Sequence, residues 1–223
     1  LTRNVKEFQI EAIKLLEERF NEILSICVEK KIKIITNMGA ANPVAAVKKI
    51  KEIANLKNIK NLKLAAVIGD DILVNLNKYG ENNILEFNKK LSEISDTLVS
   101  ANAYLGVDGI IEALENNADI VITGRCADPA LFLAPLIYEF KWDRANTDLI
   151  AKGIMIGHLL ECGAQVSGGY YSVPGKDDIQ DLWNVGFPIA EVSENGDVVI
   201  TKTETTTGKV TPDTCKEQLI YEI

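Results

Sequence analysis

The sequence contains little cysteine or histidine, with four cysteines and one histidine among 223 residues. The cysteines stand far apart and form no CxxC pair, which excludes a zinc ribbon and a thioredoxin motif. A single histidine excludes a metal site built from several imidazoles. We therefore expect buried, reduced thiols in a cytoplasmic protein that needs neither disulfides nor a structural metal.

Basic charge and long apolar runs are also missing. The net charge is −8, and the acidic residues are spread along the chain instead of gathering in a tail. Nucleic acids and anionic membranes bind basic faces, so this charge argues against both as partners. The longest apolar runs, such as residues 130–138, are too short to span a bilayer, and no secretory signal is visible. A small molecule is the partner that we expect, and the sequence leaves a homo-oligomer open.

Three motifs that identify common classes of α/β protein are absent as well. The chain has no GxGxxG, no GxxxxGK[ST] and no GxSxG. These absences argue against the dinucleotide-binding fingerprint, a P-loop and the nucleophile elbow of a hydrolase. The sequence therefore names no cofactor.

The two ends of the sequence indicate a piece of a longer protein. The chain begins with Leu1 instead of methionine, and residues 221–223 continue a helical pattern. We expect both ends to expose apolar surface that further segments cover.

Helical and strand patterns alternate through the first two thirds of the chain. Apolar residues at helical spacing predict a long helix over residues 5–30. Short apolar runs predict strands at 32–35, 62–68, 97–99 and 119–122. The helical patterns that follow these strands lie at 42–56, after 71, at 85–94, at 109–116 and after 128. Asn42-Pro43 and Asp128-Pro129 carry the cap-plus-proline pairs that begin helices.

These units in series predict an α/β fold with a mainly parallel, Rossmann-like sheet and flanking helices over residues 1–166, ending in a helix at 147–162. Residues 167–223 then change pattern. Strands at 187–192 and 198–202, joined by an Asn-Gly turn, predict a β-hairpin, and Thr211-Pro212 caps a last helix. We expect this smaller α+β segment to extend the parallel domain.

Polar and small residues follow each of the four predicted strands. They are Asn37, Gly39, Gly69, Asp70, Asp71, Ser100, Asn102, Thr123, Gly124 and Arg125. Ligands of open α/β sheets bind beyond the carboxyl ends of the strands, so we expect these residues to line one crevice. The alternative is that strand-to-helix turns use the same residue types for caps and tight backbone angles.

Several of these residues suggest particular chemistry. The helix that begins after Asn42 could hold an anion at its free N–H groups, whereas Asp128 would repel one at its own helix. Arg125 could clamp a carboxylate or phosphate, or form an ordinary ion pair with Asp128 or Glu139. Asp70 and Asp71 could act as a base or hold a divalent metal, although one of them could simply cap the next helix; we expect no metal site.

His158 is the candidate general base, because imidazole titrates near neutral pH. Glu161 lies three residues later on the same predicted helical face and could orient the ring. Gly153 and Gly157 on the same helix favour the alternative, in which the helix is tightly packed and the histidine only satisfies a buried carbonyl group.

Long stretches of the sequence resemble the acyclic terpene utilisation (AtuA-like) family. The resemblance extends from about Leu15 onward and is carried by TNMGAANP (36–43), SANAYLG (100–106), ITGRCADP (122–129) and GHLLECGAQ (157–165), with shorter matches at 168–170, 186–191 and 216–219. It implies a role in the breakdown of acyclic terpenes such as citronellol and geraniol through branched acyl-CoA intermediates.

Two functions are compatible with this resemblance. In the first, the protein is an enzyme component in which Asn37, Asn102 and Arg125 bind the oxygens of a carboxylate or acyl-CoA, while His158 and Glu161 move a proton. In the second, it is a non-catalytic binding or accessory subunit of an acyl-CoA carboxylase or hydratase system.

Overall fold

The computed structural model describes residues 5–39, 42–171 and 178–221, with side chains from residue 14 onward. The chain divides into two compact units, Leu1–Ala127 and Asp128–Ile223, and each is described by itself. The predicted domain boundary near residue 166 lies inside the second unit. The outermost residues of both chain ends, on which the expected apolar surface depends, fall partly outside the described residues.

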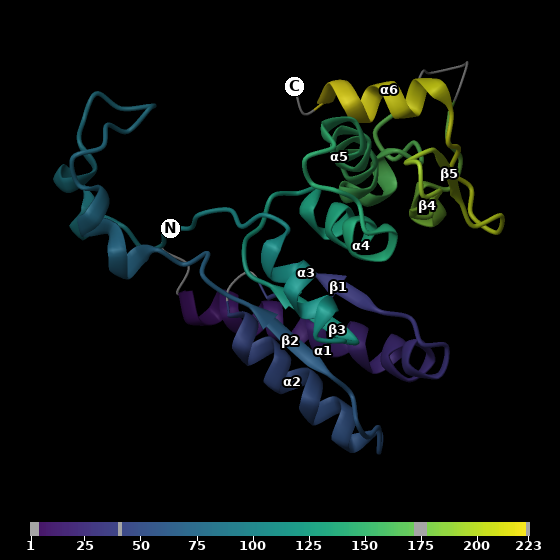
Figure 1. Ribbon diagram of the computed structural model, residues 1–223, viewed down its shortest axis with the longest axis horizontal. Coiled ribbons are helices and arrows are strands. Elements are labelled where there is room, and N and C mark those ends of the chain that lie inside the picture. Colours follow the sequence, from purple (N-terminus) through teal and green to yellow (C-terminus); the bar gives the residue numbers. More distant parts are fainter. Residues whose placement is uncertain (1–4, 40–41, 172–177, 222–223) are drawn as a thin grey trace. The chain divides into compact units, whose positions relative to one another are not determined.

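The first unit is built on a parallel sheet of three short strands (Figure 1). Their bounds are β1 (Ile34–Thr36), β2 (Leu64–Val67) and β3 (Ile120–Thr123). The order is β1-β3-β2, so β3 pairs on both sides, and all four of its residues are buried. Parallel pairing places the carboxyl ends of all three strands at one edge of the sheet.

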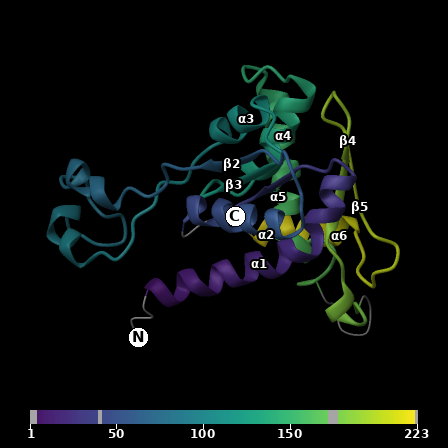
Figure 2. The same cartoon turned by 90° about the horizontal axis from the view of Figure 1, so that it is seen from below.

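Three helices pack around this sheet, as Figures 1 and 2 show. They are α1 (Val5–Glu29), α2 (Pro43–Leu56) and α3 (Asp108–Glu115). The apolar stripes of α1 and α2 meet alternate residues of β3 in one core, formed by Leu16, Phe20, Leu24, Ala46, Ile50, Ile53, Ala54, Ile120 and Ile122. The predicted long helix at the start of the chain is confirmed.

Two predictions for the segment between β2 and α3 are wrong. The helix expected at 85–94 is replaced by turns and the short 3₁₀ helix η2 (Leu91–Glu93), because the asparagine-rich sequence around it favours turns. The strand expected at 97–99 does not form, since η3 (Ser95–Thr97) leads into irregular chain. A third 3₁₀ helix, η1 (Leu73–Tyr79), begins the segment. The parallel sheet therefore has three strands in the described part of the chain instead of four.

The second unit combines three helices with an antiparallel hairpin. The α-helices are α4 (Ala130–Phe140), α5 (Thr147–Glu161) and α6 (Pro212–Tyr221). The strands of the hairpin are β4 (Pro188–Val192) and β5 (Val198–Lys202). Two short 3₁₀ helices, η4 (Gly163–Gln165) and η5 (Leu182–Asn184), also belong to this unit. The predicted hairpin and the last helix are confirmed, and Thr211 Oγ1 accepts from Thr214 N at 3.2 Å as the cap.

Two side chains attach the hairpin turn to the helices of this unit. Trp142 Nε1 donates to the Glu194 carbonyl oxygen at 2.7 Å, and Lys152 Nζ lies 3.1 Å from Asp197 Oδ1. Hydrogen bonds from Lys152 and Asn195 lower the pKa of Asp197. The tip of the hairpin is thereby held against α5 and the chain that precedes it.

The start of α4 differs from its prediction. The helix begins at Ala130, Pro129 occupies the N-cap position, and no side chain caps it there. Pro129 packs directly against residue 157 of α5, and no space is left there for a side chain on α5. A Cβ at Gly157 would lie 2.6 Å from Pro129 Cβ, so α5 approaches closely because residue 157 is glycine.

No helix in the described ranges is long and apolar enough to cross a membrane. None of the four cysteines is in a disulfide, and Cys126 is buried.

The core of the first unit yields a test of this packing. Ile50 is fully buried, so Ile50→Ala should lower the free energy of unfolding by about 2–5 kcal/mol through lost burial and a residual cavity. Leu56→Ala, on the same helix but 83% exposed, should change it by less than about 0.5 kcal/mol. Urea unfolding followed by circular dichroism measures both, and equal effects would contradict the core described above.

Candidate functional site

Asp70 stands at the centre of the polar residues beyond the carboxyl edge of the sheet. It follows β2 and is only 4% exposed. Its Oδ2 accepts from Asn102 Nδ2 at 2.9 Å and from the backbone N–H of Arg125 at 2.8 Å. A buried carboxylate requires such donors, because an unpaired one costs several kcal/mol. One side chain thus joins the segment after β2, the segment before α3 and the turn after β3.

The Asp70 carboxylate lies where residue 124 would carry a side chain, and residue 124 is glycine. A Cβ at residue 124 would lie 2.0 Å from Asp70 Oδ1, well inside any tolerated contact. The backbone N–H of Gly124 donates to the Val67 carbonyl oxygen at 3.2 Å, which keeps the turn close to the end of β2. Glycine is therefore required here by close approach to Asp70.

The segment containing Asn102 runs beside the turn after β3. Ala103 N donates to the Asp70 carbonyl oxygen at 2.8 Å, and Leu105 N donates to that of Arg125 at 3.2 Å. Ala127 N then donates back to the Leu105 carbonyl oxygen at 2.8 Å. The predicted third strand is absent, yet irregular chain with the same polar residues reaches the same place.

Arg125 and Tyr104 form a pair on the exposed side of this framework. The guanidinium carbon lies 4.9 Å from the centre of the Tyr104 ring, and Nη2 donates to the Tyr104 hydroxyl. No carboxylate among the described residues of the first unit lies within ion-pair distance of Arg125. Stacking on tyrosine restricts the side chain while leaving its charge available to an anion.

The remaining predicted residues of the first unit hold the ends of the strands in place. Asn42 Oδ1 accepts from Ala45 N at 2.9 Å and caps α2, as predicted. Asp71 Oδ1 accepts from Leu73 N, the first residue of η1, at 3.0 Å. The N-cap position of η1 is Ile72 and no side chain caps it, so the helix cap that the sequence left open for Asp70 or Asp71 does not form. Asn37 and Ser100 are exposed.

Two glycines and a threonine complete this set. A Cβ at Gly39 would lie 2.8 Å from the Thr123 carbonyl oxygen, so β1 and β3 end in close contact there. Gly69 has φ of +117°, a backbone angle that disfavours other residues. Thr123 is fully buried, and its hydroxyl donates to the Gly124 carbonyl oxygen at 2.9 Å.

His158, Glu161 and Asp128 belong to the second unit. His158 Nε2 lies 3.2 Å from the Gln218 carbonyl oxygen on α6, and Gln218 Nε2 donates to the His158 carbonyl oxygen at 2.8 Å. Glu161 Oε1 accepts from Cys162 Sγ at 2.8 Å, and Asp128 is exposed. The alternative to catalysis was that His158 satisfies a buried carbonyl group on a tightly packed helix. The contact between His158 and the Gln218 carbonyl oxygen is of this kind. Catalysis by His158 stays a prediction.

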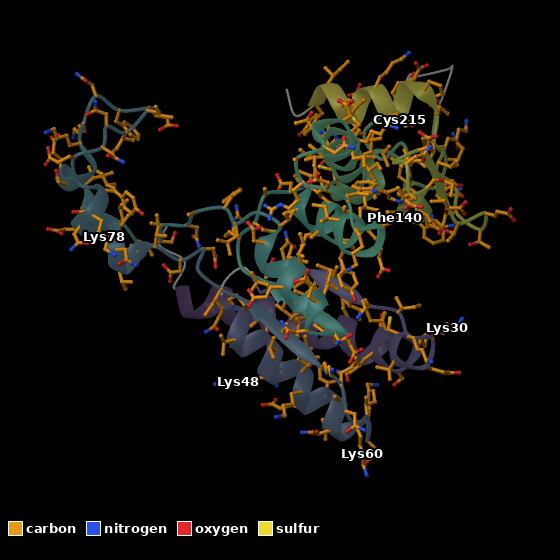
Figure 3. The ribbon with its side chains drawn as sticks, in the orientation of Figure 1. Lys30, Lys48, Lys60, Lys78, Phe140 and Cys215 are labelled. Carbon is orange, nitrogen blue, oxygen red and sulfur yellow. The ribbon has the colours of Figure 1, made fainter. Side chains whose placement is uncertain are left out.

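The described residues contain no cluster of metal ligands, and one of their thiols, that of Cys215, has a raised pKa. No group of three His, Cys, Asp or Glu side chains among them is arranged to hold a metal ion. Burial raises the pKa of the Cys215 thiol on α6 (Figure 3), and a hydrogen bond with Thr214 lowers it in part. A thiol with a raised pKa is a poor nucleophile near neutral pH.

Two residues of these arrangements were not predicted as site residues. Tyr104 lies inside the motif at 100–106, two positions after Asn102, and an aromatic residue beside a candidate anion-binding arginine could have identified it. Gln218 lies inside the match at 216–219, but nothing in the sequence pairs it with His158, which is 60 residues away.

Comparison with known protein families matches most of the chain. The model of a family described as "Acyclic terpene utilisation family protein AtuA" matches residues 9–223. No curated protein and no solved structure matches the chain significantly.

The contact between Gly124 and Asp70 can be tested directly. Gly124→Ala should destabilise the protein by about 1–3 kcal/mol, because the buried carboxylate has to move away from its donors. Gly106→Ala is the matched control, since a Cβ at residue 106 would meet nothing within 4 Å, and it should be close to neutral. Thermal unfolding compares the two variants, and a neutral Gly124→Ala would show that Asp70 is not confined as described.

Proposed function

The chain belongs to the acyclic terpene utilisation family AtuA, and on that premise we propose that it binds a carboxylate or acyl-CoA ligand beyond the carboxyl edge of its parallel sheet. The family resemblance drawn from the sequence motifs is confirmed by the match over residues 9–223. The proposal places the protein in the cytoplasmic breakdown of branched acyl-CoA derivatives of citronellol- or geraniol-type terpenoids. It also takes the α/β unit to be Rossmann-like, with its ligand at the sheet edge where such folds bind theirs.

The observation that carries this proposal is the position of Arg125. Its backbone N–H is tied to Asp70, its guanidinium stacks on Tyr104, and no carboxylate among the described side chains of the first unit forms an ion pair with it. A guanidinium presents paired N–H groups that match the two oxygens of a carboxylate or the oxygens of a phosphate. The site therefore offers a restrained cation with unused donors, which is what an anionic ligand requires.

Asn102 supplies a neighbouring polar group. Its Nδ2 is occupied by Asp70, so its amide orientation is fixed and its carbonyl oxygen is left to accept from a ligand hydroxyl or amide. Asn37 and Asn42 follow β1 at the same edge of the sheet. A carboxylate of a terpenoid acid and the phosphates of its CoA ester share the anionic oxygens that this set would recognise.

The geometry of Asp70 favours a non-catalytic role as the second candidate function. Its Oδ2 already accepts two hydrogen bonds, and the side chain is almost completely buried. Such a carboxylate positions Asn102 and Arg125 and is poorly placed to remove a proton from a ligand. This arrangement is compatible with a binding or accessory subunit of an acyl-CoA carboxylase or hydratase system.

Ligand binding by the intact chain tests the proposal. Calorimetry with CoA, a branched acyl-CoA and the corresponding free acid should show binding, and Arg125→Gln should weaken it by at least about tenfold through loss of a charge-assisted contact. Arg19→Gln, which removes an exposed arginine on α1, is the matched control and should bind like the unchanged protein.

The three ligands separate the sources of the anion. Binding of the free acid without CoA identifies the carboxylate as the group held by Arg125, whereas binding of CoA alone identifies the phosphates. Equal affinities of the Arg125→Gln and Arg19→Gln variants for every ligand, or no binding by the unchanged protein, would refute the proposed site.

His158→Gln distinguishes catalysis from packing in the second unit. Glutamine can still donate to the Gln218 carbonyl oxygen, so the variant should unfold within about 1 kcal/mol of the unchanged protein. If His158 is a general base, conversion of a branched acyl-CoA, followed by mass spectrometry, should fall by about 100-fold or more. Retained conversion would leave His158 as a packing residue.

A further inference from the structure

Residues 73–100 form a separate lobe, which we call the arm. Every hydrogen bond that the described residues of the arm make ends within residues 71–101. At its base, Ile72 N donates to the Ala101 carbonyl oxygen at 3.0 Å, and Asp71 pairs with Asn102. Figures 1 and 2 both show the arm extending away from β2 and α3, and Lys78 marks it in Figure 3. The arm is thus attached to its own unit at one place.

The arm exposes large apolar side chains. Leu85 is 97% exposed and Val74 is 86% exposed. Phe87, Val99 and Tyr79 are also exposed. Isolated surface apolar residues are ordinary, but a patch of them on a projecting segment marks an interaction surface.

Apolar and polar residues alternate at the tip of the arm, between residues 85 and 88. Between Ile84 and Lys89 the chain turns back on itself, with Ile84 N donating to the Lys89 carbonyl oxygen at 3.0 Å. Within this turn apolar Leu85 and Phe87 flank the charged Glu86. The tip therefore presents two apolar side chains together with one acidic and one basic group.

The first unit also contains a groove of complementary character. Its volume is about 380 Å³, and it lies between α3 and the outer side of β2, which is an edge strand in the sheet order β1-β3-β2. Leu64, Ala66 and Ala113 contribute apolar lining, and Lys63 and Glu112 supply one charge of each sign. An edge strand also offers backbone groups that can pair with another chain.

We propose that two copies of this chain associate by exchanging arms, with Leu85 and Phe87 of each copy seated in the groove between β2 and α3 of the other. Lys63 of the groove is then available to Glu86 of the incoming tip, and Glu112 to its Lys89. Arm and groove lie on the same unit, so each copy can give its arm and receive the other's, and the exchange that we propose is the reciprocal one that closes as a symmetric dimer.

The area available is consistent with a dimer. An aromatic side chain such as Phe87 buries about 150–250 Å² when it enters a pocket, and the arm exposes four further large apolar side chains. A reciprocal exchange uses the arm and the groove twice, which brings the buried area towards the roughly 1,200 Å² at which specific interfaces begin. A single arm on an unrelated surface would bury about half as much.

Analytical ultracentrifugation of the intact chain tests the association. We expect a monomer–dimer equilibrium with a Kd on the order of 1 µM, weakened at least about tenfold in Leu85→Asp, because a charge replaces an apolar group in the groove. Leu56→Asp, at an exposed leucine of α2, is the matched control and should associate like the unchanged protein. A monomer at all concentrations up to about 100 µM, or equal association of the two variants, would overturn the proposal.

Photo-crosslinking from benzoylphenylalanine at position 87 identifies the surface that the tip contacts and does not depend on a destabilising variant. Mass spectrometry should find crosslinks to peptides containing residues 63–68 or 109–118 in species of twice the chain mass. Crosslinks confined to a single chain, or dimer crosslinks to other segments, would exclude the proposed exchange.

Discussion

A carboxylate buried at the end of a strand has to find hydrogen-bond donors inside the protein, and much of the first unit follows from how Asp70 meets this requirement. Its donors come from Asn102 and from the backbone of Arg125, so two segments far apart in the sequence are fixed at the end of β2. Gly124 is glycine because the carboxylate occupies the place of a side chain. By binding the backbone of Arg125, the buried Asp70 also fixes the position of the exposed pair of Arg125 and Tyr104.

The second unit depends on a different kind of contact. A helix with glycine at 153 and 157 approaches α4 closely, since a Cβ at Gly153 would lie 2.5 Å from Leu133 Cδ1. On another side, His158 and Gln218 connect α5 to α6 through two hydrogen bonds that involve their backbone carbonyl groups. The one histidine of the chain is therefore part of a helix–helix contact, and any catalytic use of it would have to coexist with that contact.

The edge strand β2 and the arm both expose groups that can contact another chain. β3 pairs on both sides and is buried, whereas β2 has one partner and carries a groove along its outer side. After β2 the chain forms a lobe that is held at a single base and exposes five large apolar side chains. Open backbone groups and exposed apolar surface both favour association with another chain.

Local sequence signals determined most of the helices, the hairpin and the three strands of the sheet. Periodicity identified α1 and α5, Asn42-Pro43 began α2 with the predicted cap, and Asn-Gly placed the turn between β4 and β5. These signals work because they depend on neighbouring residues: side chains spaced along one helix, a cap within one turn, a two-residue reversal. The same reasoning failed between residues 85 and 99, where a few apolar residues fit helix, strand and turn alike.

The contacts across the sheet edge were decided by tertiary structure. The sequence singled out Asp70, Asn102, Gly124 and Arg125 as polar or small residues after predicted strands, although one of those strands does not exist. It could not show that Asp70 binds the amide of Asn102, that Gly124 makes room for it, or that Tyr104 holds Arg125. Each of these contacts joins residues 20 or more positions apart, and their distances are set by the packing of β2 and β3 and not by any local preference of the chain.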